Sequence, residues 1–96
     1  MGQSARFALS EVRLGIMPGG GGTQNLPRAV GERRAKELIF TARAFTAQEG
    51  LDWGLVNRVC EPARLLEEAL ATAQAISENG PLSIRQAKKS IHYGLQ

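Results

Sequence analysis

Four consecutive glycines, Gly19 to Gly22, follow Pro18 and constrain this chain more than any other feature of its sequence. A glycine run loses considerable conformational entropy when it becomes ordered, so we expect a structural reason for it. The run stands between a segment of imperfect alternation and a helical pattern that begins near Thr23. It therefore predicts a tight backbone loop that leads into a helix.

Three kinds of functional loop contain such glycines, and the sequence excludes two of them. A phosphate-binding P-loop needs a lysine after its glycines, and none follows here. A dinucleotide-binding fingerprint needs its last glycine at position 24 or 25, where Gln24 and Asn25 stand. The third kind is a loop whose amide groups face an anion or a polarised water at a helix start. That loop and a plain flexible turn both stay open.

Helical periodicity dominates the chain after the glycine run. Apolar residues at helical spacing predict helices over 32–42, from Pro62 to about 79, and from Pro81 onward. Thr46 and Glu49 match a capping box, in which a hydroxyl and a carboxylate satisfy amide groups at a helix start. These patterns predict a mainly helical chain.

Extended structure is predicted in only two short pieces. Residues 7–16 fit an extended segment followed by a turn, and residues 55–59 read as a short strand. The last helical pattern runs to Gln96 without a stop signal, which suggests an interrupted chain.

Length and composition limit the possible classes of protein. Ninety-six residues make at most one small domain, and no apolar run approaches the roughly 20 residues of a membrane span. The first residues lack the apolar core of a signal peptide, so we expect an intracellular protein. Cys60 and His92 are the only cysteine and the only histidine. We therefore expect no internal disulfide and no metal site.

The net charge of +3 is a mild bias. Arg33, Arg34 and Lys36 lie close together, but Glu32 and Glu37 flank them. Nucleic-acid binders usually carry a stronger basic stripe with interleaved aromatic residues. A solvated helix face is the better interpretation, and we do not expect a nucleic-acid partner.

Glu11 stands eight residues before Gly19. A single glutamate in such a segment is usually a solvated surface charge. Nothing in its spacing overturns that interpretation, so the residue pattern alone does not assign Glu11 a function.

A resemblance to a known family adds what the pattern lacks. Residues 10–24 resemble the enoyl-CoA hydratase/isomerase (crotonase) family, whose pattern is P-E-x-x-x-G-x-x-P-G-x-G-G-T-Q; here the letters are S-E-V-R-L-G-I-M-P-G-G-G-G-T-Q. Similar landmarks follow at Ala35-Lys36-Glu37-Leu38, at Thr46-Ala47-Gln48-Glu49 and at Gly54-Leu55-Val56-Asn57. The likeness covers nearly the whole chain from Phe7 onward.

The resemblance implies a crotonase-like α/β fold, of which this chain would be the mainly α-helical C-terminal portion with one or two short strands. Residues 1–60 would end the catalytic core, and residues 61–96 would begin a helical oligomerisation region. Members act on acyl-CoA thioesters, with coenzyme A as part of the substrate and no separate cofactor. They form homo-oligomers, as trimers or dimers of trimers. A cytoplasmic location is expected in a bacterium and a mitochondrial one in a eukaryote.

The resemblance also implies roles for individual residues. In the family, two glutamates manage the water and the protons while two amide groups hold the thioester oxygen. Glu11 matches the glutamate that exchanges a proton with the α-carbon of the substrate. Gly19 matches the glycine whose amide helps position the water, and Gly20 and Gly21 complete the substrate-binding loop.

The sequence departs from the family pattern at several positions. Ser10 replaces the usual proline, and Asn25 and Ala42 stand where arginine and glycine are common; neither of the latter positions is expected to carry chemistry. The second glutamate and both oxyanion amides of the family belong to a first half that does not precede Met1. Because such groups contribute factors of roughly 10² to 10⁴ each, we expect this chain alone to be inactive.

Three alternatives stay open at this point. Isomerases, dehalogenases and thioester hydrolases share much of the pattern. The apolar helices from Pro62 onward fit a non-catalytic interaction module. RNA binding rests only on the cluster Arg33, Arg34 and Lys36. We expect Trp53 in the core and not on a ligand platform.

Overall fold

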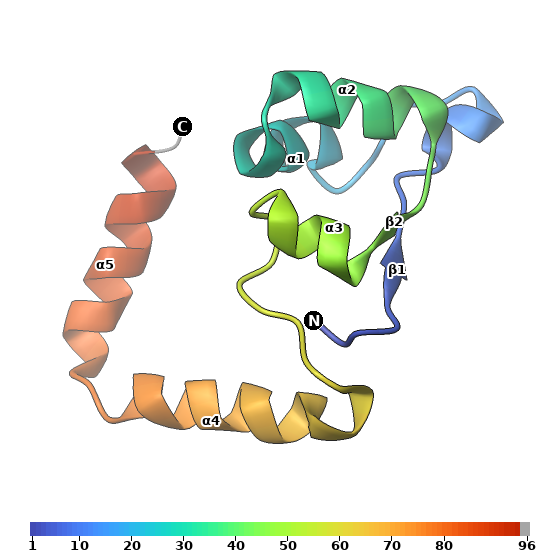
Figure 1. Cartoon of the computed structure of the whole chain (residues 1–96). Helices are drawn as coiled ribbons and strands as arrows, with labels where there is room; N and C mark the ends of the chain where they lie inside the picture. Colours follow the sequence, from blue (N-terminus) through green and yellow to red (C-terminus); the bar gives the residue numbers. More distant parts are fainter. Residues whose placement is uncertain (95–96) are drawn as a thin grey trace. The chain divides into compact units, whose positions relative to one another are not determined.

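The computed structural model describes residues 1–94. The chain forms two compact units, one over Met1–Ala63 and one from Arg64 onward. Figure 1 labels their helices and strands. The division of roles predicted at residue 60 stays a prediction.

The first unit combines short helices with a minimal sheet. Its elements in chain order are β1 (Arg6–Phe7), the 3-10 helix η1 (Glu11–Leu14), α1 (Gly22–Val30), α2 (Glu32–Thr41), β2 (Phe45–Thr46) and α3 (Ala47–Asp52). The two strands are antiparallel, with Arg6 opposite Thr46 and Phe7 opposite Phe45. The ladder therefore ties the start of the unit to the segment that follows α2.

The core of this unit lies mainly between α1 and α2. The stripe predicted from the spacing of Ala35, Leu38 and Ile39 is buried, at 1%, 2% and 8% exposure. Helix α1 contributes Leu26 and Val30 to the same cluster, and Phe45 of β2 joins it. The amphipathic helix predicted over 32–42 is confirmed, with α2 ending one residue earlier.

Ala42 belongs to the same apolar stripe but has left the helix. It is the residue after α2, it is 1% exposed, and its φ is 54°. Among the described residues it is the one non-glycine residue with a positive φ. Ala42 is thus a left-handed helix end, a conformation that glycine adopts most easily.

Helix α3 begins with the predicted capping box. The Thr46 hydroxyl accepts a hydrogen bond from the Glu49 amide, and the Glu49 carboxylate accepts one from the Thr46 amide, both at 3.0 Å. The Glu49 carboxylate also forms a two-pronged ion pair with Arg43, at 2.8 and 3.2 Å. Arg43 first, and the Thr46 amide next, lower the pKa of Glu49 to about 2.

The strand predicted over 55–59 is wrong. Gly54 has a φ of 78°, and the amides of Leu55 and Val56 both turn back to the carbonyl of Gly50. These bonds hold the chain in a turn, so it cannot run extended. Only Cys60 makes a strand-like contact, an isolated parallel bridge to Gly2.

The extended segment predicted over 7–16 is correct only at its start. Residues Arg6–Phe7 form β1, but Glu11–Leu14 form the 3-10 helix η1. The amide of Gly15 donates to the carbonyls of Glu11 and Val12, which closes this helical turn. The predicted turn is therefore present, and it carries Glu11.

The second unit consists of helices without a buried face. It holds α4 (Leu65–Ser77) and α5 (Pro81–Gly94), and the 3-10 turn η2 (Pro62–Arg64) precedes α4. Pro81 opens α5 as predicted, whereas Pro62 opens only the 3-10 turn and the long helix begins at Leu65. No described residue of α4 or α5 is buried. The described helices include none that is long and apolar enough to cross a membrane.

Candidate functional site

Glu11 is the first residue of the η1 turn and is half-buried. Gly15 ends this turn with a φ of 74°, a left-handed conformation that other residues adopt only at a cost. The amide of Ile16 then bonds back to the carbonyl of Glu11 at 3.3 Å. The chain therefore reverses after η1 and returns toward Glu11.

This reversal brings Glu11 and Gly19 together. The amide of Gly19 donates a hydrogen bond to Oε2 of Glu11, with an N···O distance of 3.1 Å. The residue pattern gave no reason to connect the two positions, whereas the family resemblance singled out both of them. The first contact within the candidate site is thus a carboxylate held by a loop amide.

The glycine run is an ordered loop in which several positions require glycine. Gly20 and Gly21 have left-handed φ values of 58° and 79°. A Cβ added to Gly21 would lie 2.9 Å from the side-chain nitrogen of Asn25. The amide of Gly22 bonds to the carbonyl of Gly19 at 3.0 Å, and α1 begins there. The predicted tight loop into a helix is confirmed, one residue earlier than Thr23.

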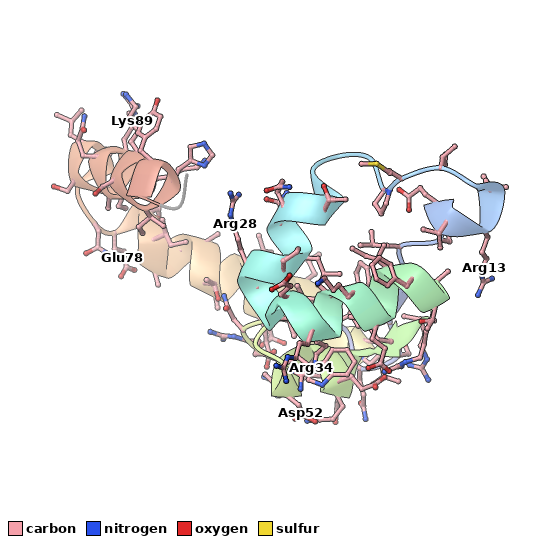
Figure 2. The ribbon with its side chains drawn as sticks, turned by 90° about the horizontal axis from the view of Figure 1, so that it is seen from above. Arg13, Arg28, Arg34, Asp52, Glu78 and Lys89 are labelled. Atoms are coloured by element: carbon pink, nitrogen blue, oxygen red, sulfur yellow. The ribbon has the colours of Figure 1, made fainter. Side chains whose placement is uncertain are left out.

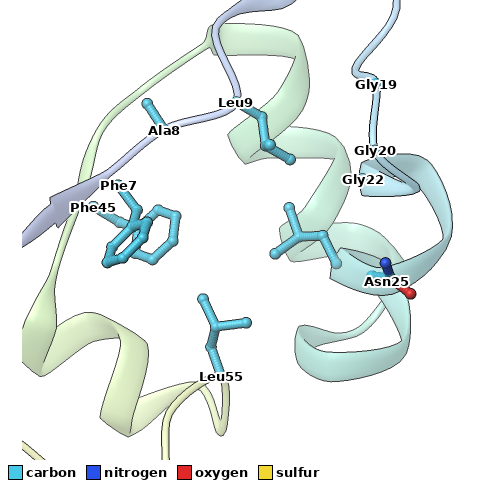
Figure 3. Close-up of a pocket in the computed structure, with 10 residues that line it drawn as sticks. Phe7, Ala8, Leu9, Gly19, Gly20, Gly22, Asn25, Phe45 and Leu55 are labelled. Atoms are coloured by element: carbon cyan, nitrogen blue, oxygen red, sulfur yellow. The ribbon is translucent and has the colours of Figure 1, made fainter. Parts of the chain in front are cut away.

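An apolar cavity of about 300 Å³ adjoins the loop (Figure 3). Gly19 and Gly20 form part of its wall, whereas Gly21 does not. Glu11 is not among its lining residues either, so Gly19 is the link between the carboxylate and the cavity. The remaining walls consist of Phe7, Ala8, Leu9, Gly22, Asn25, Leu26, Phe45 and Leu55.

The sequence did not predict the apolar walls of this cavity. Phe7 and Phe45 meet across the β1–β2 ladder, with ring centroids 6.0 Å apart, and this pairing has no local signature. Leu55 was assigned to a strand that does not form. Asn25 was noted only as a departure from the family pattern, and it supplies a polar side chain to the wall (Figure 3).

Two members of the basic cluster of α2, Arg34 and Lys36, have local partners. The guanidinium of Arg34 lies 5.0 Å from the ring centre of Trp53, and that of Arg43 lies 5.5 Å from it. Lys36 pairs with Glu32 at 2.8 Å and lowers the pKa of that glutamate. Trp53 itself packs against the core, as expected. These contacts favour a structural helix face over a nucleic-acid surface.

Within residues 1–94, no three His, Cys, Asp or Glu side chains gather where they could hold a metal ion. The polar groups of the candidate site are one carboxylate, one loop amide and one side-chain amide. Such a set suits proton transfer and hydrogen bonding to a substrate.

Comparison with known proteins gives one consistent result. A family model described as enoyl-CoA hydratase/isomerase matches residues 1–96. The chain is 48% identical to the short-chain-enoyl-CoA hydratase of Clostridium acetobutylicum, over 97% of the chain and 36% of that protein. It is 43% identical to the mitochondrial methylglutaconyl-CoA hydratase of Mus musculus, over 97% of the chain and 31% of that protein.

The likeness extends to three dimensions. The crystal structure of the enoyl-CoA hydratase from Bacillus anthracis matches with a TM-score of 0.95 and 47% identity, over 99% of this chain and 37% of that one. The chain thus spans about a third of the length of these relatives. The comparisons do not support the narrower prediction that this third is the C-terminal portion.

Proposed function

The chain belongs to the enoyl-CoA hydratase/isomerase family, and from this membership we propose that Glu11 and the loop at Gly19 form one side of a hydratase site. That site adds water across the double bond of an α,β-unsaturated acyl-CoA. The observation that carries the proposal is the 3.1 Å hydrogen bond between Gly19 and Glu11 beside an apolar cavity. Relatives named as short-chain-enoyl-CoA and crotonyl-CoA hydratases support the reaction type.

In the proposed reaction, Glu11 acts as the general acid toward the α-carbon. The oxygen of a water molecule bonds to the β-carbon, the carbon–carbon double bond becomes single, and the carboxyl group of Glu11 delivers its proton to the α-carbon. The water gives its surplus proton to a second base, and that proton then restores Glu11. The net change is the addition of one water molecule, and positioned acid catalysis contributes about 10² to 10⁴ in rate.

The loop and the cavity serve substrate binding in this proposal. A volume of about 300 Å³ is at the small end of ligand sites, which suits a short acyl group better than the whole thioester. Gly19 and Gly20 allow the backbone to approach that acyl group because they carry no side chain. Gly21, outside the lining, contributes through the left-handed turn that shapes the loop.

Among residues 1–94, the candidate site described above holds Glu11 and no second carboxylate that could act as the second base. We therefore propose that residues 1–96 alone do not hydrate crotonyl-CoA measurably. A decay of the conjugated thioester absorbance above buffer would contradict this, and its loss in a Glu11→Gln variant would place a second acid within the chain.

The function is tested in a chimera in which this chain replaces the matching third of the Bacillus anthracis enzyme. Glu11→Gln is expected to lower kcat for crotonyl-CoA hydration by about 10² to 10⁴, because it removes the proton donor. The exposed Glu61→Gln serves as the matched control and should leave kcat unchanged. A folded chimera that hydrates equally well with Gln at position 11 would refute the proposal. Movement of a double bond without water addition would favour the isomerase alternative.

A second role, as an oligomerisation surface, is proposed for α4 and α5. Leu66 is 71% exposed, Leu82 69% and Ile91 65%, so these helices present apolar area that a second copy could cover. Sedimentation velocity over a concentration series tests this. A concentration-dependent increase in mass supports it, and strictly monomeric behaviour at high concentration contradicts it.

A further inference from the structure

We propose that Arg13 is a positioning residue that fixes the η1 turn, and with it Glu11, to the end of α2. Arg13 stands two residues after Glu11 and projects from the η1 turn (Figure 2). Its Nη2 donates a hydrogen bond of 3.2 Å to the carbonyl oxygen of Ala42, 29 residues away in sequence. The purpose of this positioning rests on the proposed function, whereas the contact itself does not.

The end of α2 is a suitable anchor for a cation. The last carbonyls of a helix have no partner within it, and the helix dipole makes that end partly negative. Ala42 caps α2 in the left-handed conformation, and its carbonyl accepts from Arg13. The guanidinium therefore satisfies an acceptor and meets a favourable charge at the same place.

The anchor is rigid because α2 is held by the core through Ala35, Leu38 and Ile39. The η1 turn has one apolar contact with this core, through Val12. Leu14, at 80% exposure, gives no second apolar contact. Within the turn, Val12 supplies the apolar contact and Arg13 the polar one, so the bond from Arg13 adds a second, directional attachment of the turn to α2.

The glycine loop holds its own shape without η1. The bond from the Gly22 amide to the Gly19 carbonyl closes the loop, and a Cβ on Gly22 would lie 3.2 Å from Pro18. The Gly19 amide is the donor that this closed loop presents, and Glu11 meets it only if η1 is correctly oriented. Arg13 acts on the site through that orientation.

A double-mutant cycle on the 96-residue chain tests the inference by NMR. Glu11→Gln is expected to move the amide signal of Gly19, because its acceptor changes from a carboxylate to an amide. In an Arg13→Gln background the same change should move that signal at least about twofold less, because coupled residues are not additive. Arg28→Gln, which removes an exposed charge from α1, should leave the full shift. A full shift in the Arg13→Gln background would overturn the proposal.

A measurement on the unaltered chain keeps the inference testable if Arg13→Gln does not fold. The Arg13 guanidinium should show slowed rotation and a nuclear Overhauser effect to Ala42. A freely averaging guanidinium would overturn the proposal. Neither measurement depends on turnover, so loss of the proposed hydratase function in the chimera and loss of the positioning role are separate outcomes.

Discussion

The two units carry the same kind of helix and bury it to opposite extents. Helix α2 in the first unit places Ala35, Leu38 and Ile39 at 8% exposure or less. Helix α4 in the second unit has its own apolar residues, yet Leu66 and Leu70 are 71% and 59% exposed. The spacing of apolar residues predicted both helices equally well. The spacing of apolar residues therefore specifies which face of a helix is apolar. That face stabilises the fold only where it is buried against another surface.

The difference in burial between the two units implies a difference in the stability of their helices. Helices of 13 and 14 residues, such as α4 and α5, are marginal in water when no packing supports them. Burial contributes about 25 cal/mol for each Å² of apolar surface, and α2 gains this from α1 and β2. Truncation of an apolar side chain should thus cost more in the core face of α2 than on the exposed face of α4.

The largest expected effect comes from removing the side chain at the centre of the core. Leu38→Ala, at a position 2% exposed, should destabilise the first unit by about 2–5 kcal/mol, because it leaves a cavity. Leu70→Ala on α4 makes the same chemical change at 59% exposure and should cost well under 1 kcal/mol. Urea unfolding followed by the fluorescence of Trp53, which packs against the core, measures both. Equal losses of unfolding free energy in the two variants would contradict the difference in burial between α2 and α4.

A smaller effect is expected at the start of α3. Thr46→Ala removes the hydroxyl that accepts from the Glu49 amide and should destabilise the first unit by about 1 kcal/mol. Thr72→Ala is the matched control in α4, where the hydroxyl only bonds back to the carbonyl of Glu68. Since alanine favours a helix interior, this control should not lower stability. A shift in the Trp53 unfolding curve with Thr72→Ala and none with Thr46→Ala would contradict the comparison.

The smallest effect concerns pH. The pKa of Glu49 falls from 4.5 to about 2 in the folded chain, first because of Arg43, so folding is favoured while the carboxylate is ionised. That contribution is complete above pH 4.5, declines as the pH falls toward 2, and is absent below it. Glu49→Gln should flatten the pH dependence of Trp53-monitored unfolding in this window. Glu67→Gln, at an exposed pair on α4, should leave it unchanged.

Much of the fold could be predicted because its signals are local. The stripe of α2, the capping box of Thr46 and Glu49, and the opening of α5 by Pro81 are all contained within a few residues. The strand assigned to 55–59 failed for the opposite reason. Its β-branched residues are typical of a strand, but the amides of Leu55 and Val56 both donate to the carbonyl of Gly50, and these bonds form a turn. The true ladder joins Phe7 to Phe45, a pairing that no local pattern records.

The candidate site also combines features that local sequence predicts with features that depend on the tertiary structure. The glycine run predicted a tight loop. The left-handed conformations of Gly20 and Gly21 explain why glycine is favoured at these two positions. Glu11 could not be singled out by residue type or spacing, because its contact with Gly19 depends on the reversal at Gly15. Family resemblance singled out both Glu11 and Gly19, and the structure supplied the hydrogen bond between them and the apolar wall beside it.

The left-handed conformation of Ala42 has a consequence for the stability of the first unit. Holding alanine at a φ of 54° costs about 1–2 kcal/mol. Glycine would avoid this, but it would forfeit a buried methyl group worth about 0.8 kcal/mol and add about 0.5–1 kcal/mol of flexibility to the unfolded chain. Alanine and glycine should therefore give almost the same stability at this position. Exchange of alanine for glycine at position 42 should change the free energy of unfolding by less than about 1 kcal/mol.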